Sequence, residues 1–427
     1  MSSGIGYSRV CDVQTPRELI VVVGAGVVGV SIALELQRRG KPVLVVDRKG
    51  VATEASCGNA GAFAFTDIIP LATPGIMRKA PKWLLDPTGP LSVPPAYALN
   101  IAPWMLRFWR ASWPDRYTKS VTAQTQLMTV SRAALERQIE HSGGATLIRR
   151  DGQLQLYEGA REFAASQAGL ELRRGHGIAF DTLSGADEIA EIQPGLDKRF
   201  THAVFTPTWM STIDPLLWVE HLARAFIARG GQIAKADVRA LQAAEDSVLL
   251  DTSGGAVTAG QVVIAAGAWS HHVTRALGDR VPLETERGYN TTLPAGAFDL
   301  RTQLTFGGHG FVVTKLGEDV RVGGAVELGG LKLRPNFKRA DVLLKKAKRF
   351  LPGLRTENGT QWMGFRPSMP DSLSVIGASS KSKRVLYAFG HGHLGLTQSA
   401  GTAELIADLA TDGRPALSLD PFSPGRF

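Results

Sequence analysis

The fold is decided by residues 19–47, which read Leu19-Ile-Val-Val-Val-Gly-Ala-Gly-Val-Val-Gly-Val-Ser-Ile-Ala-Leu-Glu-Leu-Gln-Arg-Arg-Gly-Lys-Pro-Val-Leu-Val-Val-Asp47. The run from Leu19 to Val23 is apolar and rich in β-branched residues, as is typical of a parallel strand buried on both faces. A glycine turn and a helical pattern of apolar residues follow, and Gly40 ends the helix. A second buried strand then runs from Val43 to Val46. The stretch therefore predicts a strand–helix–strand unit.

The glycine turn has the spacing of a dinucleotide-binding motif. Gly24, Gly26 and Gly29 supply G-x-G-x-x-G. The first glycine allows the tight turn, the second lets the backbone approach a pyrophosphate, and the third lets the helix pack closely on the strand. Val27 and Val28 open the helix, where free N–H groups and the positive end of the helix dipole favour phosphate. We therefore expect these residues to bind a pyrophosphate.

An acid completes the motif. Asp47 follows the second strand, roughly 20 residues beyond the glycines, where a carboxylate accepts hydrogen bonds from the ribose of an adenosine. A 2′-phosphate would be repelled there. Because strand, helix, second strand and acid all fall in order, a dinucleotide site is favoured over an ordinary glycine turn. The motif does not separate NAD from FAD, since both carry an ADP half.

Composition limits the class of protein. The chain has 427 residues, 44% of them apolar and 20% charged, which is typical of a soluble globular protein of two or three domains. Its two cysteines, Cys11 and Cys57, cannot form a disulfide framework and belong to no metal-ligand cluster, so we expect a reducing compartment and no metal. The sequence shows neither a signal peptide nor a run long enough to span a bilayer. We expect a cytoplasmic protein, with a peripheral position on the inner face of the membrane as the alternative.

The formal net charge of +9 suggests an anionic partner, but the basic residues are scattered. The densest cluster falls at helical spacing and consists of Lys338, Arg339, Lys345, Lys346, Lys348 and Arg349. A solvated helix face is favoured over a nucleic-acid site, because acids and apolar residues lie between these positions. The charge then serves solubility and attracts acidic substrates or lipid headgroups.

A loop rich in small and hydroxyl residues follows Asp47 and contains Ser-x-x-Asn-Ala-Gly at Ser56 to Gly61. Such a loop suits a phosphate-bearing ligand, although an ordinary flexible loop has the same composition. Together with the unit before it, the segment resembles the D-amino acid dehydrogenase branch of the FAD-dependent D-amino acid oxidase and glycine oxidase (DAO) family. In that family the loop runs along the FAD pyrophosphate and ribityl chain. The resemblance assigns this contact to Ser56, Asn59, Ala60 and Gly61, and Arg48, directly after Asp47, is a further candidate for binding the cofactor.

The resemblance extends over nearly the whole chain. It places Val238 at the adenine, and it places the end of the strand that begins at Gln261 under the dinucleotide. A late glycine-rich loop, Gly390 to Thr397, opens a helix whose positive end favours the negative charge of a reduced flavin. The remaining FAD contacts implied by the family are Ala266, Gly267, Trp269, Gly364, Gly392, His393, Leu394, Gly395, Leu396 and Thr397.

Three residues are candidates for the substrate site. Arg366 lies in Gly-x-Arg-Pro, and the matching arginine of the family holds the substrate carboxylate, which a planar guanidinium grips through two hydrogen bonds. The alternative is a structural pair between Arg366 and Asp371. Tyr289 matches a position near the substrate and could donate to the same carboxylate, although a buried structural hydroxyl is the alternative. For His393, contact with the flavin edge is favoured over general-base catalysis.

The predicted fold is α/β, with a glutathione-reductase-like Rossmann FAD domain and an inserted substrate domain that contains a mixed, mainly antiparallel sheet. Strands such as Asp319 to Glu327 belong to that sheet. The FAD domain is assigned residues 18–145, 213–275 and 360–427, with a helical insert at about 68–117, and the substrate domain 146–212 and 276–359. The insert is proline-rich and carries four tryptophans that are either buried or form an interfacial anchor: Trp83, Trp104, Trp109 and Trp113.

The resemblance implies an FAD-dependent dehydrogenase that oxidises a D-amino acid, or a D-hydroxyproline-like imino acid, and passes electrons to a quinone or an electron-transfer protein. The alternatives are a glycine or sarcosine oxidase that uses O2, and an FAD-carrying subunit of a larger complex. We expect FAD to be non-covalent, because Asn59 stands where histidine-linked relatives carry the attachment residue. The sequence sets neither the amino acid, nor the acceptor, nor the oligomeric state.

Overall fold

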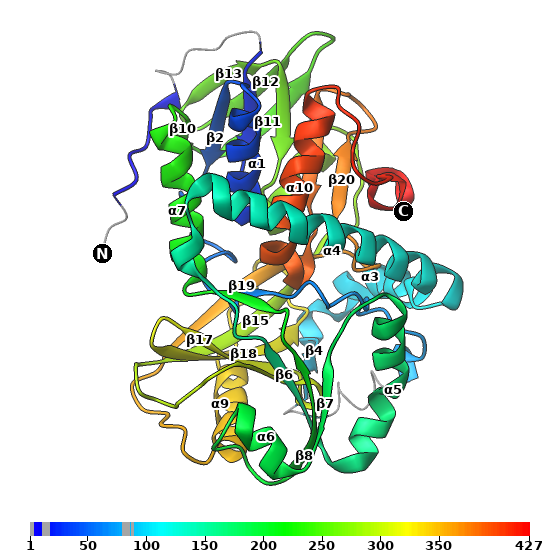
Figure 1. Cartoon of the computed structure of the whole chain (residues 1–427). Coiled ribbons are helices and arrows are strands. Elements are labelled where there is room, and N and C mark those ends of the chain that lie inside the picture. The colour runs from blue at the N-terminus through cyan, green and yellow to red at the C-terminus, as the bar shows by residue number, and fades with distance from the viewer. Residues whose placement is uncertain (1–3, 11–17, 79–85, 87–88) are drawn as a thin grey trace.

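The structure is a computed structural model that describes residues 4–10, 18–78, 86 and 89–427. Two sheets organise it, one in each half of the molecule (Figure 1). A six-stranded sheet with its helices forms one half, and a nine-stranded sheet with its own helices forms the other. This is the mixed α/β architecture predicted from the sequence.

The six-stranded sheet is built from segments that are far apart in the sequence. Its strands, in spatial order, are β10 (Gln232–Lys235), β2 (Val43–Asp47), β1 (Ile20–Val23), β14 (Gln261–Ile264), β21 (Val385–Phe389) and β20 (Val375–Ala378). All neighbours pair in parallel except β20 and β21. Burial of β1 and most of β2 on both faces explains their continuous apolar runs. The strand–helix–strand prediction for residues 19–47 is confirmed.

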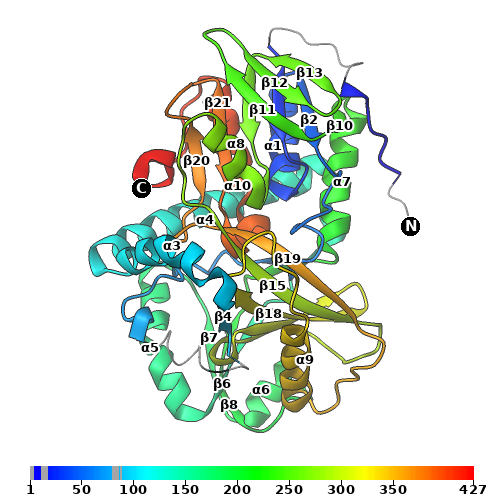
Figure 2. The same ribbon diagram turned by 180° about the vertical axis from the view of Figure 1, so that it is seen from behind.

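Helices cover one face of this sheet and a small sheet covers the other. The helices are α1 (Val27–Arg38), α4 (Pro114–Ser142), α7 (Pro215–Ala228) and α10 (Gly395–Ala410), and they form one continuous apolar core with the sheet. A second core lies on the opposite face, beneath the antiparallel strands β11 (Val238–Ala243), β12 (Val248–Thr252) and β13 (Gly255–Ala259) and beside α8 (Ser270–Ala276) (Figure 2). The sheet is therefore closed on both faces, and ligands can reach it only at strand ends.

The second unit is organised by the nine-stranded sheet. Its main path runs through β19 (Thr360–Ser368), β15 (Glu284–Leu293), β18 (Asp319–Glu327), β17 (Phe311–Leu316), β16 (Gln303–Phe306), β6 (Gln153–Glu158), β8 (Phe200–Thr206) and β7 (Asp181–Ser184), and β4 (Leu91–Ser92) pairs with β18. Only β16–β6 and β18–β4 are parallel among these described pairs. Helices α5 (Gly159–Gly175), α6 (Ala186–Ile192) and α9 (Lys338–Phe350) pack around it. The mixed, mainly antiparallel sheet is as predicted.

The domain division stays a prediction, and the sheets differ from it at two places. Strand β19, which the sequence placed in the FAD domain, pairs along β15 from Glu284 with Ser368 to Thr292 with Thr360. Strand β4, from the helical insert, also joins this sheet. Long-range pairing decides both positions, and no local pattern reports it. We therefore propose that the boundary follows Ser368.

The predicted helical insert contains helix α3 (Ala98–Ala111). Helix α3 buries Trp104 against the ring of Phe108, while Trp109 and Trp113 stay exposed. Trp83 lies outside the described residues. Within the described part of the chain, no helix has the length and apolar character needed to cross a membrane.

In α9, Arg339 is buried and donates to the carbonyls of Gly89 and Pro90, so the predicted solvated face does not include it.

Candidate active site

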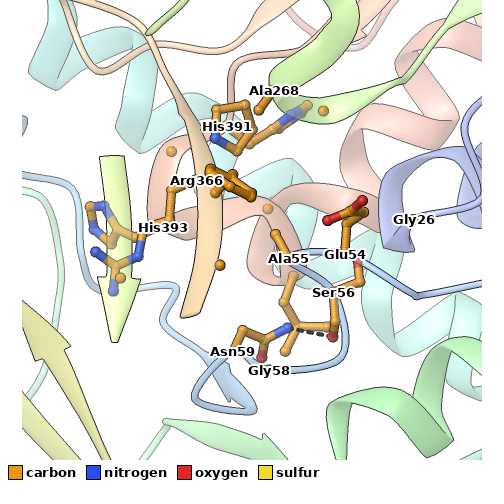
Figure 3. A pocket seen from close by; sticks show the side chains of 18 of the residues that line it. Gly26, Glu54, Ala55, Ser56, Gly58, Asn59, Ala268, Arg366, His391 and His393 are labelled. Carbon is orange, nitrogen blue, oxygen red and sulfur yellow. Dashed lines mark hydrogen bonds between the residues drawn. The ribbon is translucent and has the colours of Figure 1, made fainter. Parts of the chain in front are cut away.

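A cavity of about 1030 Å³ lies between the two sheets. It is lined by the glycine turn, the loop after β2, the ends of β11 and β14, the β15–β18–β19 face and the start of α10. Figure 3 shows the loop with Ser56, Gly58 and Asn59 across the cavity from Arg366, His391 and His393. Segments from both halves of the molecule therefore form one site.

The glycine turn leaves no room for side chains. A Cβ atom on Gly24 would lie 2.4 Å from the carbonyl oxygen of Ala265, and Gly24 has a φ of 113°. A Cβ atom on Gly29 would lie 1.9 Å from the carbonyl oxygen of Gly24, so Gly29 sets the approach of α1 to the turn. The N–H of Val27 donates to Oγ of Ser56 at 3.0 Å. Gly24 and Gly29 thus have the tight turn and the close helix packing predicted for them, and the role of Gly26 toward a pyrophosphate stays a prediction.

Asp47 borders the cavity and also holds the turn in shape. Its Oδ2 accepts from the N–H of Ala25, and its Oδ1 accepts from the N–H groups of Lys49 and Gly50, each at 2.8 Å. A carboxylate offers about four acceptor positions, so contact with a ribose remains open to it. The structural task of Asp47 is an addition to its predicted role.

The adenosine end of the cavity carries a stacked pair. The Arg48 guanidinium lies 3.9 Å from the centroid of the Trp269 ring and forms an ion pair with Glu54. Both Arg48 and Trp269 line the cavity, as do Val238, Ala266 and Gly267. Val238, which the family resemblance assigned to the adenine, therefore lines the same cavity as four further residues predicted to contact FAD.

The loop after β2 is held by its own asparagine. Asn59 donates from Nδ2 to the carbonyl of Ser56 at 3.0 Å and accepts at Oδ1 from the N–H of Gly61 at 2.8 Å. Two side chains of the other sheet brace the same loop. Asn290 donates to the carbonyl of Gly58 at 2.7 Å, and Arg321 donates to the carbonyl of Asn59 at 2.6 Å. The loop is therefore fixed from both halves.

The start of α10 closes the cavity. Lining residues here are Gly392, His393, Leu394, Gly395 and Leu396, and Gly364 contributes from β19. Three predicted cofactor residues are not in the lining: Gly29, Gly61 and Thr397. Gly29 lies in the helix–strand contact. Oγ1 of Thr397 accepts from the N–H of Ala64 at 3.0 Å, so Thr397 supports the wall from behind.

Two histidines behave differently at this end. Burial lowers the pKa of His391 to about 3, so its ring is neutral, and its Nε2 lies 3.0 Å from Oγ1 of Thr402. His393 is exposed, and its Nε2 lies 3.2 Å from Oδ2 of Asp67. Burial alone would raise the pKa of Asp67, but the hydrogen bond and charge of His393 lower it overall. His393 and Asp67 thus form a polar pair on the cavity wall.

Arg366 reaches the cavity from β19 without a carboxylate partner. Its Nη1 donates to the carbonyl of Ala325 at 3.0 Å, and among the described ion pairs none includes it. Burial lowers its pKa, with Glu286 opposing that shift, yet a guanidinium stays charged. The alternative pair with Asp371 is wrong, because Asp371 binds Arg426 at 2.8 Å. Arg366 is therefore free to take an anionic group.

The hydroxyl of Tyr289 has two partners within the protein. Its hydroxyl donates to Oε1 of Glu327 at 3.1 Å and accepts from the N–H of Asn336 at 2.9 Å. On β15, Glu286 pairs with Arg366, and Tyr289 lies three residues further along. Side chains alternate along a strand, so Tyr289 points to the opposite face. Tyr289 is among the residues that line the cavity, but the partners of its hydroxyl favour the structural role, which is the alternative that the sequence left open.

Sequence reasoning missed several lining residues on the sheet face, namely Glu286, Gly288, Asn290, Arg321 and Trp362. They share one face because Glu286, Gly288 and Asn290 pair in register with Arg366, Gly364 and Trp362. A two-residue alternation counted from Arg366 would have found them only if the β15–β19 register had been known.

Comparison with protein families decides the assignment. A family model described as FAD dependent oxidoreductase (DAO) matches residues 20–409. The chain belongs to this family. A protein named D-amino-acid oxidase, from Bradyrhizobium diazoefficiens, is 34% identical over 96% of this chain and 98% of its own length. A protein of Mesorhizobium japonicum named D-amino acid dehydrogenase 1 is 30% identical over 96% of this chain and 99% of its own length.

Solved structures share the fold of this FAD-dependent oxidoreductase. Glycine oxidase from Geobacillus kaustophilus superposes with a TM-score of 0.77 at 22% identity and covers 96% of this chain and 98% of its own. L-Proline dehydrogenase from P. horikoshii has a TM-score of 0.75 at 20% identity and covers 97% and 98%. At these identities the likeness supports the fold alone.

The residues present fit FAD. Gly24, Gly26 and the N-terminus of α1 offer a bare, positive turn for a pyrophosphate, and the start of α10 offers a second helix end on the far side. One continuous cavity joins the two helix ends, and its lining includes both Val238 and Arg366. The turn and the loop of Asn59 would hold the ADP half, and the start of α10 the flavin half.

Proposed function

We propose that this oxidoreductase removes a hydride from Cα of a D-amino acid, or of a D-configured cyclic imino acid such as a hydroxyproline. The observation that carries the proposal is Arg366, a charged and partly buried guanidinium in the cavity with no ion-pair partner among the described residues. A cation that is partly removed from water is costly without an anion, so an anionic ligand suits this site. The names of the relatives from Bradyrhizobium and Mesorhizobium support a D-amino acid.

The chain's own residues would orient the substrate. Arg366 would bind the α-carboxylate through two parallel hydrogen bonds and so fix the direction of the Cα–H bond. FAD, when bound, supplies the acceptor for the hydride. His393 and Asp67 would border the substrate end as a polar pair, and the apolar wall near Phe311 would exclude water. Carboxylate capture and alignment are therefore the main tasks of the protein here.

The electron acceptor is proposed to be a quinone or an electron-transfer protein. The relative named D-amino acid dehydrogenase 1 supports an acceptor other than O2. The first alternative is an oxidase of the glycine or sarcosine type, supported by the relative named D-amino-acid oxidase. The second alternative, a relay subunit without a substrate site, is disfavoured by the carboxylate clamp.

A peripheral membrane position fits the surface of α3. Leu99, Leu106 and Trp109 are exposed on one side of α3, with Leu99 90% accessible, and the exposed Trp113 follows just beyond the end of the helix and packs on Trp109. Exposed Arg107 lies among them. An apolar stripe beside basic residues suits the headgroup region of an anionic bilayer, where a quinone would be available. We propose that this surface seats the enzyme on such a membrane from the cytoplasmic side.

An anaerobic panel tests the proposal. Purified protein with bound FAD is mixed, without oxygen, with D- and L-amino acids, D-proline, cis-4-hydroxy-D-proline, glycine and sarcosine. We expect D-amino or D-imino acids to bleach the flavin absorbance and L-isomers to leave it unchanged. Bleaching by glycine or sarcosine alone favours the first alternative, and no bleaching by any compound rejects the function. Reoxidation by a soluble quinone, compared with O2, then identifies the acceptor.

A further inference from the structure

A second charged group lies beside Arg366. Glu286, on β15, is 4% exposed and lines the same cavity. Among the described residues it has no hydrogen-bond or ion-pair partner. Glu284, two residues earlier on the strand, is different, because its carboxylate accepts from the Tyr97 hydroxyl at 2.9 Å and from the N–H of Thr285 at 2.7 Å. Glu286 is therefore a buried acid whose partner is absent.

The pairing register places Glu286 and Arg366 side by side. They are directly opposite each other in the antiparallel β15–β19 pair, so both side chains rise from the same face of the sheet. Cβ atoms of such pairs are about 4.5–5.5 Å apart. Yet the guanidinium of Arg366 forms no ion pair with the carboxylate of Glu286. It leans over Gly288 instead, where an added Cβ atom would lie 2.2 Å from Nη2 of Arg366. The wall thus presents one cation and one anion as separate groups.

We propose that Glu286 binds the α-ammonium group of the substrate while Arg366 binds its carboxylate, so that the two side chains recognise the amino acid as a zwitterion. This inference rests on the proposed function. The ammonium and carboxylate groups of an α-amino acid are bonded to the same carbon, Cα. A carboxylate and a guanidinium that neighbour each other on one sheet face match that arrangement. Each buried side chain then gains the partner that it lacks in the protein alone.

The rival role for Glu286 is that of a counterion that only balances the charge of Arg366. The two roles predict effects of opposite sign. If Glu286 only competes for Arg366, its neutralisation strengthens the binding of every carboxylate. If Glu286 binds ammonium, its neutralisation weakens the binding of amino acids and strengthens that of carboxylates without an amino group. Desamino acids with the same carbon skeleton therefore separate the roles.

The experiment uses the holoenzyme and its Glu286→Gln variant, with Glu284→Gln as the matched control on the same strand. Steady-state KM values are measured for D-alanine, D-leucine and D-phenylalanine. Competitive inhibition constants are measured for propionate, 4-methylpentanoate and 3-phenylpropionate. We expect Glu286→Gln to raise KM about tenfold to hundredfold, the range for losing one charge-assisted hydrogen bond, and to tighten inhibition by the desamino acids. Glu284→Gln should change neither quantity.

Each outcome decides the matter. Lower KM and tighter inhibition together identify a counterion and overturn the inference, as does an unchanged KM. If Glu286→Gln does not retain FAD, then Glu286→Asp decides: a raised KM with unchanged inhibition supports ammonium binding, and an unchanged KM rejects it. If no amino acid reduces the flavin of the parent enzyme, both the proposed function and this inference are rejected. A parent that is reduced normally with an unaffected Glu286→Gln variant rejects only the role of Glu286.

Discussion

The guanidinium of Arg366 occupies the space that a side chain at position 288 would need, since a Cβ atom on Gly288 would lie 2.2 Å from its Nη2. A Gly288→Ala variant should therefore displace Arg366 from the cavity wall. A displacement of about 1 Å in a positioning group can cost about 100-fold in rate, so we expect a loss of that order in kcat/KM. FAD content should stay normal. The control is Gly175→Ala at the end of α5, where an added Cβ atom meets nothing within 4 Å. Unchanged kinetics in Gly288→Ala would contradict the packing.

Asp47→Ala should weaken FAD binding and also lower the stability of the apoprotein. The sequence predicts the first effect, because a ribose contact is lost. The structure adds the second, because the N–H groups of Ala25, Lys49 and Gly50 lose their acceptor. Unsatisfied buried donors cost about 1–3 kcal/mol. Urea unfolding of the apoprotein measures the stability, and flavin fluorescence on dilution measures FAD release. At saturating FAD the KM for substrate should be unchanged. An apoprotein variant as stable as the parent would show that the turn keeps its shape without the Asp47 carboxylate.

Local signals were sufficient for much of the fold. Residues 19–47 carry their strand, turn and helix signals within one continuous stretch, and the predicted strand Asp319–Glu327 has the same bounds in the structure. Buried parallel strands and alternating strands differ in pattern, so strands such as Val43–Asp47 and Asp319–Glu327 were assigned to the right sheet. The glycines of the dinucleotide motif likewise report backbone geometry that no other residue fits.

The features that the sequence could not predict depend on contacts between distant segments. Tyr289 and Arg366 both lie in the right region, but the β15–β19 register decides that their side chains face opposite ways. The same register brings Glu286 into the cavity, whereas an acid in a strand pattern normally indicates a solvent face. Asp371 is close to Arg366 in sequence, yet Arg426 from the C-terminal segment takes it. Spacing along the chain carries no information about such pairings.

The buried histidine at the start of the late loop should make folding stability depend on pH. Burial lowers the pKa of His391 to about 3, against about 6.5 in an unfolded chain. Above pH 6.5 the ring is neutral in both states and has no effect. Between pH 6.5 and about 3 the unfolded chain binds a proton that the folded chain does not, so stability falls as pH falls. The slope is about 1.4 kcal/mol per pH unit, or about 2 kcal/mol between pH 6.5 and 5.

His391→Asn removes this titration. We expect its free energy of unfolding, from urea titrations at pH 7 and pH 5, to fall by about 2 kcal/mol less than that of the parent. His141→Asn, at an exposed position, should keep the pH dependence of the parent. Equal pH dependence in the parent and in His391→Asn would place the ring in contact with water.

The apolar stripe of α3 should bind anionic lipid. Flotation with vesicles of phosphatidylglycerol and phosphatidylcholine should carry the protein at low salt and release it at high salt, because each basic residue near the surface adds about 1 kcal/mol. Leu106→Glu should abolish flotation, since it puts an anion in the middle of the stripe. Leu249→Glu removes an exposed leucine on β12 instead and should float like the parent. Absence of the parent from the lipid fraction at low salt would reject the membrane position.

The substrate assignment depends on Arg366, and two substitutions separate its charge from its geometry. Arg366→Lys keeps a cation but loses the paired hydrogen bonds, so the amino acid should bind more weakly and lie out of line. A lost charge-assisted hydrogen bond costs about 1.5–3 kcal/mol, which is roughly a tenfold to hundredfold decrease in kcat/KM. Arg366→Ala should lose more. FAD content should stay near normal in both, because the guanidinium contacts the Ala325 carbonyl and the substrate end of the cavity.

Amines without a carboxylate provide the internal control for Arg366. They should be poor substrates of the parent enzyme and lose little more in either variant, because they have no group for the guanidinium to hold. The measurement is kcat/KM for each D-amino acid and for the corresponding decarboxylated amine, in the parent and both variants. If Arg366→Ala lowers both values equally, the residue supports the site rather than the carboxylate. If kcat/KM for the amino acid does not change, or if the variant loses its flavin, then Arg366 does not bind substrate. In either case the D-amino acid assignment would depend on the relatives alone.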